Sequence, residues 1–128
     1  MTQTLSMYMA QANAVIDTIA VHDAVAMLSN PDVLFVDVRE SAEIQKKGVI
    51  PGSVHAPRGF LEFIADPAGP MHKGDLSSGK QLIVYCATGG RSVLAAKTLT
   101  DMGINNVSNM AGGFTAWREA GGTVEEVG

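Results

Sequence analysis

The chain has 128 residues, a formal net charge of −4 and 46% hydrophobic residues. This length and apolar content suit one domain with a single core. The 14 glycines and the low aromatic content of 5% predict tight turns and a core of aliphatic side chains, as in helices packed on a sheet. Because lysines and arginines are few and scattered in an acidic chain, nucleic acid is not an expected partner.

The single cysteine excludes an intramolecular disulfide and any site made of several thiolates, which fits a reducing cytoplasm. The N-terminal 20 residues have no positive residue ahead of their apolar stretch, and polar residues interrupt it. Neither a secretory signal nor a membrane span is therefore expected. His22, His55 and His72 lie far apart in the sequence, so we expect no metal site and no cofactor.

Apolar residues at helical spacing predict a first helix that covers the sheet or a neighbouring subunit. They are Leu5, Met9, Ala12 and Ile16. We assign residues 1–17 to this helix and residues 18–128 to one domain. The further predicted elements, in chain order, are a strand at 18–20, a helix at 22–28, a strand at 33–36, a helix at 40–47, a turn at 50–52, a short strand from 54, a helix at 59–65, a long loop at 66–79, a strand at 82–85, a helix at 92–102, a strand at 106–108, a helix at 114–120 and an extended piece at 123–127.

Two continuous apolar runs, Val33–Val36 and Leu82–Tyr85, have the length and composition of strands buried on both faces. Asp37 follows the first run and Cys86 follows the second. The alternation of strands with helices predicts an α/β fold with a parallel sheet and helices on both faces.

Cys86 lies where ligands gather in an open parallel sheet, at the carboxyl end of a strand and ahead of a helix. The residues after it are Ala87, Thr88, Gly89, Gly90 and Arg91. Their backbone N–H groups can curl around the sulfur, and a nearby guanidinium further favours the thiolate, which is the nucleophilic form. We therefore interpret Cys86 as a catalytic nucleophile, although a lone cysteine is more often a packed core residue.

Four motifs, in their order and spacing, resemble those of the rhodanese family of sulfurtransferases over most of the chain. They are Asp37-Val38-Arg39-Glu40, Val49-Ile50-Pro51-Gly52-Ser53, Cys86-Ala87-Thr88-Gly89-Gly90-Arg91, and Met110-Ala111-Gly112-Gly113-Phe114 with Trp117. The resemblance implies a rhodanese-like fold, with a five-stranded parallel sheet flanked by helices, for residues 18–128. It also implies that a sulfane sulfur passes through a persulfide on Cys86, from a donor such as thiosulfate to cyanide, a thiol or a partner protein.

The same resemblance makes the loop residues 87–91 the substrate-binding residues. Asp37, Arg39 and Ser92 would support that loop. Arg91 would add positive charge at the substrate or brace the loop. A salt bridge with a carboxylate such as Asp37 or Glu40 is the alternative to substrate contact and is also compatible with it.

Ala87 and Thr88 are neutral, whereas family members active on thiosulfate often carry a further cation in the loop. Attraction for a dianion is therefore weaker, and thiosulfate is expected to be a surrogate donor.

Arg58 and His55 are candidate pocket residues that follow the turn motif. Trp117 is expected to be a packing anchor.

The glycine pair Gly112-Gly113 does not belong to a phosphate-binding motif, and it indicates a close approach of two backbone segments.

Two alternatives stay open on sequence grounds. The chain could be a persulfide carrier or interaction module that waits for a protein partner, as a monomer or homodimer away from membranes. A cysteine phosphatase or arsenate reductase on the same fold would also use a thiolate cradled by amides. Such phosphatases have a longer loop than the four residues that separate Cys86 from Arg91.

Overall fold

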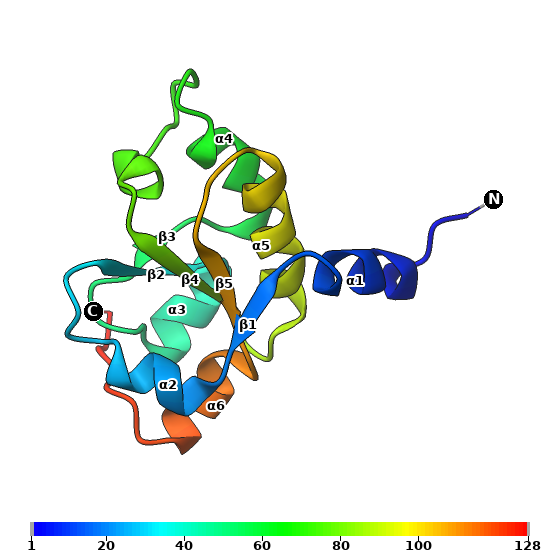
Figure 1. Ribbon diagram of the computed structural model, residues 1–128. Coiled ribbons are helices and arrows are strands. Elements are labelled where there is room, and N and C mark those ends of the chain that lie inside the picture. The colour runs from blue at the N-terminus through cyan, green and yellow to red at the C-terminus, as the bar shows by residue number, and fades with distance from the viewer. Residues whose placement is uncertain (1, 128) are drawn as a thin grey trace.

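The computed structural model describes residues 2–127. Five parallel strands form one sheet in the order β1-β5-β4-β2-β3 (Figure 1). The strands are β1 (Asp17–Ile19), β2 (Val33–Asp37), β3 (Val54–His55), β4 (Gln81–Tyr85) and β5 (Val107–Met110). The predicted α/β class and five-stranded parallel sheet are thus confirmed.

The helices between the strands lie close to their predicted positions and differ at their ends by a few residues. They are α1 (Leu5–Asn13), α2 (Val21–Ala26), α3 (Ser41–Lys47), α4 (Leu61–Ala65), α5 (Gly90–Asp101) and α6 (Gly113–Glu119), with 3-10 helices η1 (Arg58–Phe60) and η2 (Gly74–Ser77). The predicted long loop at 66–79 therefore contains a short helix, and the predicted helix at 59–65 is divided into η1 and α4.

Two predicted boundaries were wrong for local reasons. Glu40 does not begin a helix but is the N-cap residue of α3: its carbonyl oxygen accepts the N–H of Glu43 at 3.0 Å, and its own N–H donates to the Glu43 carboxylate at 2.8 Å. Asn106 has a positive φ of 63°, a turn conformation, so β5 begins one residue later. The segment predicted to be extended, 123–127, contains an isolated antiparallel bridge between Glu125 and Val49 and joins no strand of the sheet.

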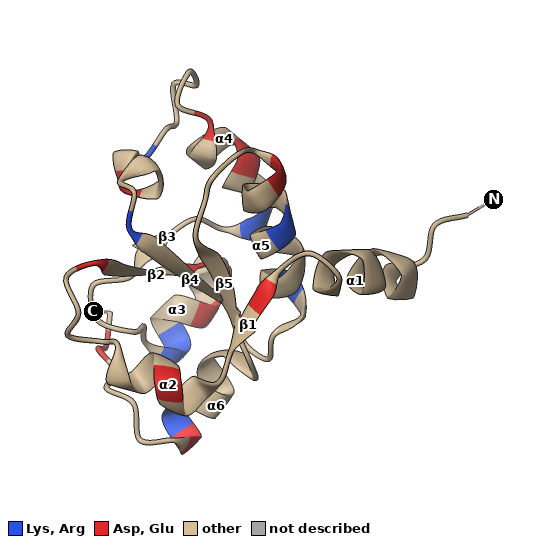
Figure 2. Ribbon diagram, in the orientation of Figure 1, with Lys and Arg blue, Asp and Glu red and all other residues tan. Residues whose placement is uncertain are grey.

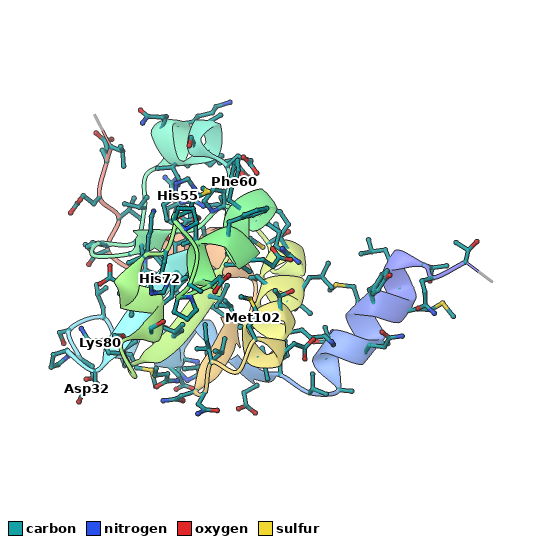
Figure 3. The ribbon with its side chains drawn as sticks, turned by 90° about the horizontal axis from the view of Figure 1, so that it is seen from above. Asp32, His55, Phe60, His72, Lys80 and Met102 are labelled. Atoms are coloured by element: carbon teal, nitrogen blue, oxygen red, sulfur yellow. The ribbon has the colours of Figure 1, made fainter. Side chains whose placement is uncertain are left out.

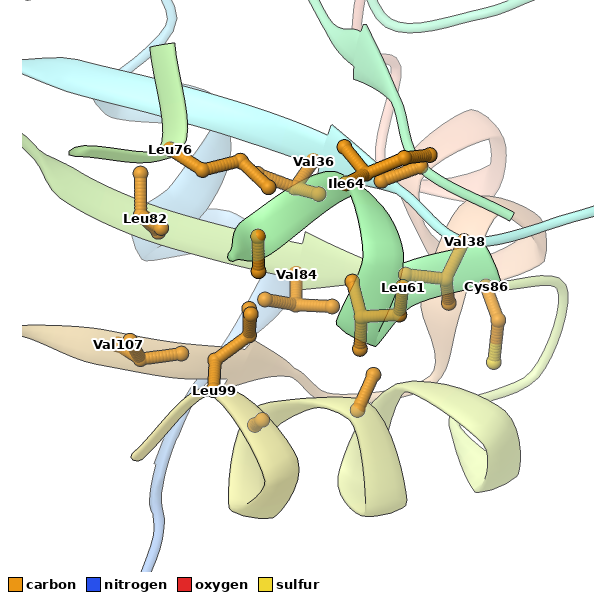
Figure 4. Packing of buried hydrophobic residues seen from close by; sticks show 14 residues of the cluster. Val36, Val38, Leu61, Ile64, Leu76, Leu82, Val84, Cys86, Leu99 and Val107 are labelled. Carbon is orange, nitrogen blue, oxygen red and sulfur yellow. The ribbon is translucent and has the colours of Figure 1, made fainter. Parts of the chain in front are cut away.

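Helices bury both faces of the sheet, as a parallel sheet requires. Val36 and Val84 face one layer, which α4 and α5 cover (Figure 4). α2 and α6 cover the other face, where Trp117 is fully buried and contacts Phe35 edge-on, with ring centroids 5.3 Å apart. The Trp117 indole N–H donates to the carbonyl oxygen of Thr123 at 2.8 Å, so the expected packing anchor is confirmed.

α1 lies outside these layers, against α5, and extends away from the rest of the molecule (Figures 1 and 3). Its Ala12 is buried, whereas Leu5 and Tyr8 are 68% and 52% exposed. It carries no charged side chain (Figure 2). The expectation that this helix covers the sheet was wrong, because it packs on another helix; its role toward a neighbouring subunit stays a prediction.

Within residues 2–127, each helix is too short or too polar to cross a membrane.

Candidate active site

Cys86 directly follows the central strand β4 and points toward the first turn of α5 (Figure 4). It shares a buried cluster with Val38 and Leu61 and is only 1% exposed. The sulfur therefore sits at the carboxyl end of the sheet, as expected, but not at the molecular surface. The loop that begins at Ala87 closes over it, and the apolar neighbours exclude water from its other side.

Hydrogen bonds favour the ionised form of this sulfur. The Gly89 N–H donates to Cys86 Sγ at 3.1 Å, and Ser92 Oγ lies 3.4 Å from Sγ. Burial raises the pKa of the Cys86 thiol, but the Ser92 hydroxyl and the backbone N–H groups of Ser92, Gly89 and Thr88 lower it by more. The pKa of Cys86 therefore lies below that of an ordinary thiol, which increases the thiolate fraction at neutral pH.

Arg91 is bound to a carboxylate on a different helix. Its two terminal nitrogens donate to the two carboxylate oxygens of Glu43, each at 2.8 Å. The Arg91 guanidinium holds the pKa of Glu43 down at about 2. The expected partners of Arg91, Asp37 or Glu40, were wrong: Asp37 is already paired with Arg39, and the capping position of Glu43 places its carboxylate beside the loop.

Asp37 and Arg39 form an ion pair that is buried beside the end of β2. Their closest atoms are 2.7 Å apart, and each side chain is 1% exposed. The Arg39 guanidinium also donates to the Gly48 carbonyl at 2.8 Å and lies 4.2 Å from the centre of the Phe114 ring. Burial lowers the pKa of Arg39, but the Asp37 carboxylate raises it by more, so Arg39 stays charged. The pair thus links β2, the end of α3 and α6.

Arg58 and His55 make contacts away from the Cys86 loop. The Arg58 guanidinium donates to Glu62 and to the Thr98 hydroxyl on α5, each at 3.1 Å. His55 Nε2 lies 2.6 Å from the Arg39 carbonyl oxygen. Neither side chain is therefore hydrogen-bonded to residues 86–91 in the described structure. The described residues also contain no cluster of histidine, cysteine and carboxylate side chains that could hold a metal ion.

The turn between β5 and α6 supports the loop from behind. The N–H of Phe114 donates to the Cys86 carbonyl at 2.8 Å, and the N–H of Thr115 donates to the Ala87 carbonyl at 3.1 Å. Gly113 has a φ of +63°, and a Cβ there would lie 2.6 Å from the Cys86 carbonyl oxygen. The close backbone approach predicted for the glycine pair is therefore confirmed, and only glycine fits it.

Asn109 was missed as a site residue by the sequence analysis. It is 3% exposed, and its Oδ1 accepts the Ser92 hydroxyl at 2.6 Å. The parallel pairing of Val84 with Asn109 places this side chain one strand away from Cys86. The available signal was a polar residue near the carboxyl end of a short strand, at the edge where the other site residues gather.

The comparisons with known proteins agree with this geometry. The model of the family "Rhodanese-like domain" matches residues 20–120. A sulfurtransferase of Allochromatium vinosum is 32% identical over 90 residues, which are 70% of this chain and 76% of that protein.

Among solved structures, a protein of unknown function from Rhodopseudomonas palustris, described as a possible tyrosine phosphatase, has a TM-score of 0.93 and 43% identity, with 98% of this chain and 96% of that one covered. A rhodanese-related protein from Thermoplasma volcanium has a TM-score of 0.68 and 28% identity, over 85% of this chain and 97% of that one.

Proposed function

Because the chain belongs to the family of rhodanese-like domains, we propose that it is a sulfurtransferase that carries a sulfane sulfur as a persulfide on Cys86. The observation that carries this proposal is the placement of Cys86 Sγ, buried beneath a loop whose Gly89 N–H and Ser92 hydroxyl lie 3.1 and 3.4 Å away. Donors arranged in this way stabilise a negatively charged sulfur.

The reaction has two half-reactions. The Cys86 thiolate attacks the outer sulfur of a donor such as thiosulfate; a new S–S bond forms, the donor S–S bond breaks, and its electron pair leaves with sulfite. A second nucleophile, such as cyanide or a thiolate, then attacks the terminal sulfur of the persulfide and returns Cys86 as a thiolate. Neither step requires a general base, because both attacking groups are already ionised.

Mass spectrometry of the intact chain after treatment with thiosulfate tests the proposal. We expect a gain in mass of one sulfur atom, located on the peptide that contains Cys86 and removed by cyanide. The single cysteine makes this assignment unambiguous. A chain that gains no sulfur from thiosulfate or from a small alkyl persulfide would contradict the proposal.

We propose that the natural donor carries less negative charge than thiosulfate. Ala87 and Thr88 are neutral, and the Arg91 guanidinium is already neutralised by both oxygens of Glu43. A dianion thus meets no unpaired side-chain cation from the loop of residues 86–91. A monoanionic or neutral persulfide would lose less solvation on entry.

The change Ala87→Arg tests this donor proposal. A cation in the loop should raise kcat/KM for thiosulfate by about tenfold, since about 1.4 kcal/mol of attraction is reasonable for one added charge near the surface. Steady-state kinetics with thiosulfate and with a small alkyl persulfide, which carries at most one negative charge, would measure this change. Ala87→Gln is the matched control, with similar bulk and no charge. Equal gains for both donors, or for both variants, would contradict the charge argument.

The partner and the cellular location belong to the same proposal. A low-molecular-weight thiol or a partner protein would accept the sulfur in a reducing cytoplasm, where a lone cysteine is stable. A persulfide carrier that waits for a protein partner would show the same gain of sulfur. It would differ by slow turnover with cyanide or small thiols.

A phosphatase activity is the second candidate. Of the two solved structures compared above, the one with the higher sequence identity, 43%, is described as a possible tyrosine phosphatase. Two features of this chain disfavour it. Only four residues separate Cys86 from Arg91, so the ring of amides is tight for a phosphoryl group. Arg91 is also occupied by Glu43. Sustained hydrolysis of an aryl phosphate that is lost in Cys86→Ser would favour the phosphatase.

A further inference from the structure

The Ser92 hydroxyl lies among three acceptors but has one proton. Its Oγ is 2.6 Å from Asn109 Oδ1, 3.3 Å from the Gly89 carbonyl oxygen and 3.4 Å from Cys86 Sγ. A hydroxyl donates one hydrogen bond at a time. The shortest distance is to Asn109, so Asn109 Oδ1 competes with Cys86 Sγ for that proton. Ser92 and Asn109 are both buried, so bulk water does not compete for that proton.

The two half-reactions place different demands on this proton. When Cys86 is a thiolate, the negative charge is on Sγ, and a hydrogen bond from Ser92 stabilises it. When Cys86 carries the extra sulfur, Sγ becomes the neutral inner atom of the persulfide and the charge moves to the terminal sulfur. Sγ is then a poor acceptor, which leaves the buried hydroxyl with Asn109 Oδ1 at 2.6 Å and the more distant Gly89 carbonyl oxygen at 3.3 Å as acceptors.

We propose that Asn109 is a positioning residue that accepts the Ser92 hydroxyl while Cys86 carries the sulfur and releases it to Sγ when the thiolate returns. This inference rests on the proposed sulfur transfer. It assigns two opposite effects to the Asn109 oxygen: it stabilises the loaded state, and it competes with the free thiolate for the Ser92 proton.

The charged groups around Cys86 do not account for such an exchange. Two ion pairs lie near the loop: Arg91 with Glu43 from α3, and Arg39 with Asp37 from β2. Within each pair the two side chains are hydrogen-bonded, so their charges compensate each other. On α4, Glu62 is bound to Arg58. β5 and the first turn of α6 contain no titratable side chain, so the β5 side of Cys86 is tuned by hydroxyl and amide groups alone. Tyr85, whose pKa burial raises, is the last residue of β4, and His55 is the last residue of β3.

The test is the pH dependence of Cys86 alkylation by iodoacetamide, a neutral reagent that reacts with the thiolate. Asn109→Leu keeps the bulk but removes the competing oxygen, so the midpoint should fall by about 0.5–1 pH unit relative to the natural chain. Asn109→Asp holds the Ser92 proton more strongly and adds negative charge, so the midpoint should rise by about 1 pH unit. A merely structural role would not move the midpoint in opposite directions.

The same substitutions in a Ser92→Ala chain provide the matched control. Without the hydroxyl, the shift caused by Asn109→Leu should disappear, while part of the shift caused by Asn109→Asp should remain through its charge. Circular dichroism and thermal unfolding identify variants that fail to fold, and Asn109→Ala replaces Asn109→Leu if the latter does. An unchanged or raised midpoint in the folded apolar variant would overturn the inference, as would an undiminished shift in the Ser92→Ala chain.

A second measurement addresses the loaded state. In an equilibrium mixture of a small thiol and its persulfide, Asn109→Leu should reduce the ratio of loaded to free Cys86 by about threefold to tenfold, because the Ser92 hydroxyl loses its closest acceptor and keeps only the more distant Gly89 carbonyl oxygen. Mass spectrometry reports this ratio. An unchanged or increased ratio would overturn the inference. Failure of the natural chain to take up any sulfur would instead contradict the proposed function, while the alkylation profile would still report on Asn109.

Discussion

Cys86→Ser is expected to lower the rate of sulfur transfer from thiosulfate to cyanide by at least about 10³-fold. The serine hydroxyl stays protonated near neutral pH, and it cannot form a persulfide. The loop that lowers the pKa of a thiol cannot compensate, because a hydroxyl ionises far less readily. Measurement of thiocyanate formation over time would give the loss.

The matched control for Cys86→Ser is Ser92→Ala, which leaves the sulfur and removes one of its hydrogen-bond donors. We expect the rate of sulfur transfer of Ser92→Ala to fall only about tenfold at neutral pH. The rate should recover at higher pH, where the thiolate forms without this hydrogen bond. Thermal unfolding should show that both variants remain folded. A Cys86→Ser chain that retains more than a small percentage of the activity would mean that another group receives the sulfur.

Asp37→Ala is expected to lower the free energy of unfolding by about 3–5 kcal/mol, because it leaves the Arg39 charge buried without its carboxylate. Arginine is too basic to lose its proton in a protein, so deprotonation of Arg39 does not relieve the cost. The pair also joins Gly48 and Phe114, so the change loosens elements on both sides of the loop. Urea unfolding at neutral pH would measure the difference.

Glu62→Ala is the matched control for the buried pair, since it removes a carboxylate from the more exposed pair with Arg58. It should change the free energy of unfolding by less than about 1 kcal/mol. Replacement of both Asp37 and Arg39 by apolar residues should recover part of the loss seen for Asp37→Ala. Similar losses for Asp37→Ala and Glu62→Ala would contradict the role assigned to burial.

The features that the sequence could predict depend on local patterns. The runs at 33–36 and 82–85 are apolar throughout, so they were identified as buried strands, and Cys86 was placed at a strand end for the same reason. The pair Gly112-Gly113 indicated a close backbone approach, because glycine has no Cβ atom to obstruct a neighbouring segment and adopts positive φ angles readily. Such signals lie within a few neighbouring residues and survive without knowledge of the tertiary structure.

The features that were missed are contacts between distant segments. Glu43 reaches Arg91 from 48 residues away, and Asn109 reaches Ser92 from 17 residues away. The partner of each depends on which strands pair and on the direction in which a helix begins. The burial of Cys86 was missed for the same reason, since Leu61 comes from a separate helix. Several carboxylates and amides in the sequence are chemically equivalent partners for Arg91 or Ser92, and only the tertiary structure determines which one is in contact.

The backbone contacts behind Cys86 have a consequence for the synthesis of the protein. Phe114 and Thr115 hold the carbonyls of Cys86 and Ala87, so the sulfur pocket lacks its rear wall until these two residues have been synthesised and have left the ribosome. An unfinished chain already contains the cysteine but retains an ordinary thiol. Reactivity toward sulfur donors is thereby coupled to synthesis of the segment that follows β5, and a chain that stops before this segment should react slowly with them.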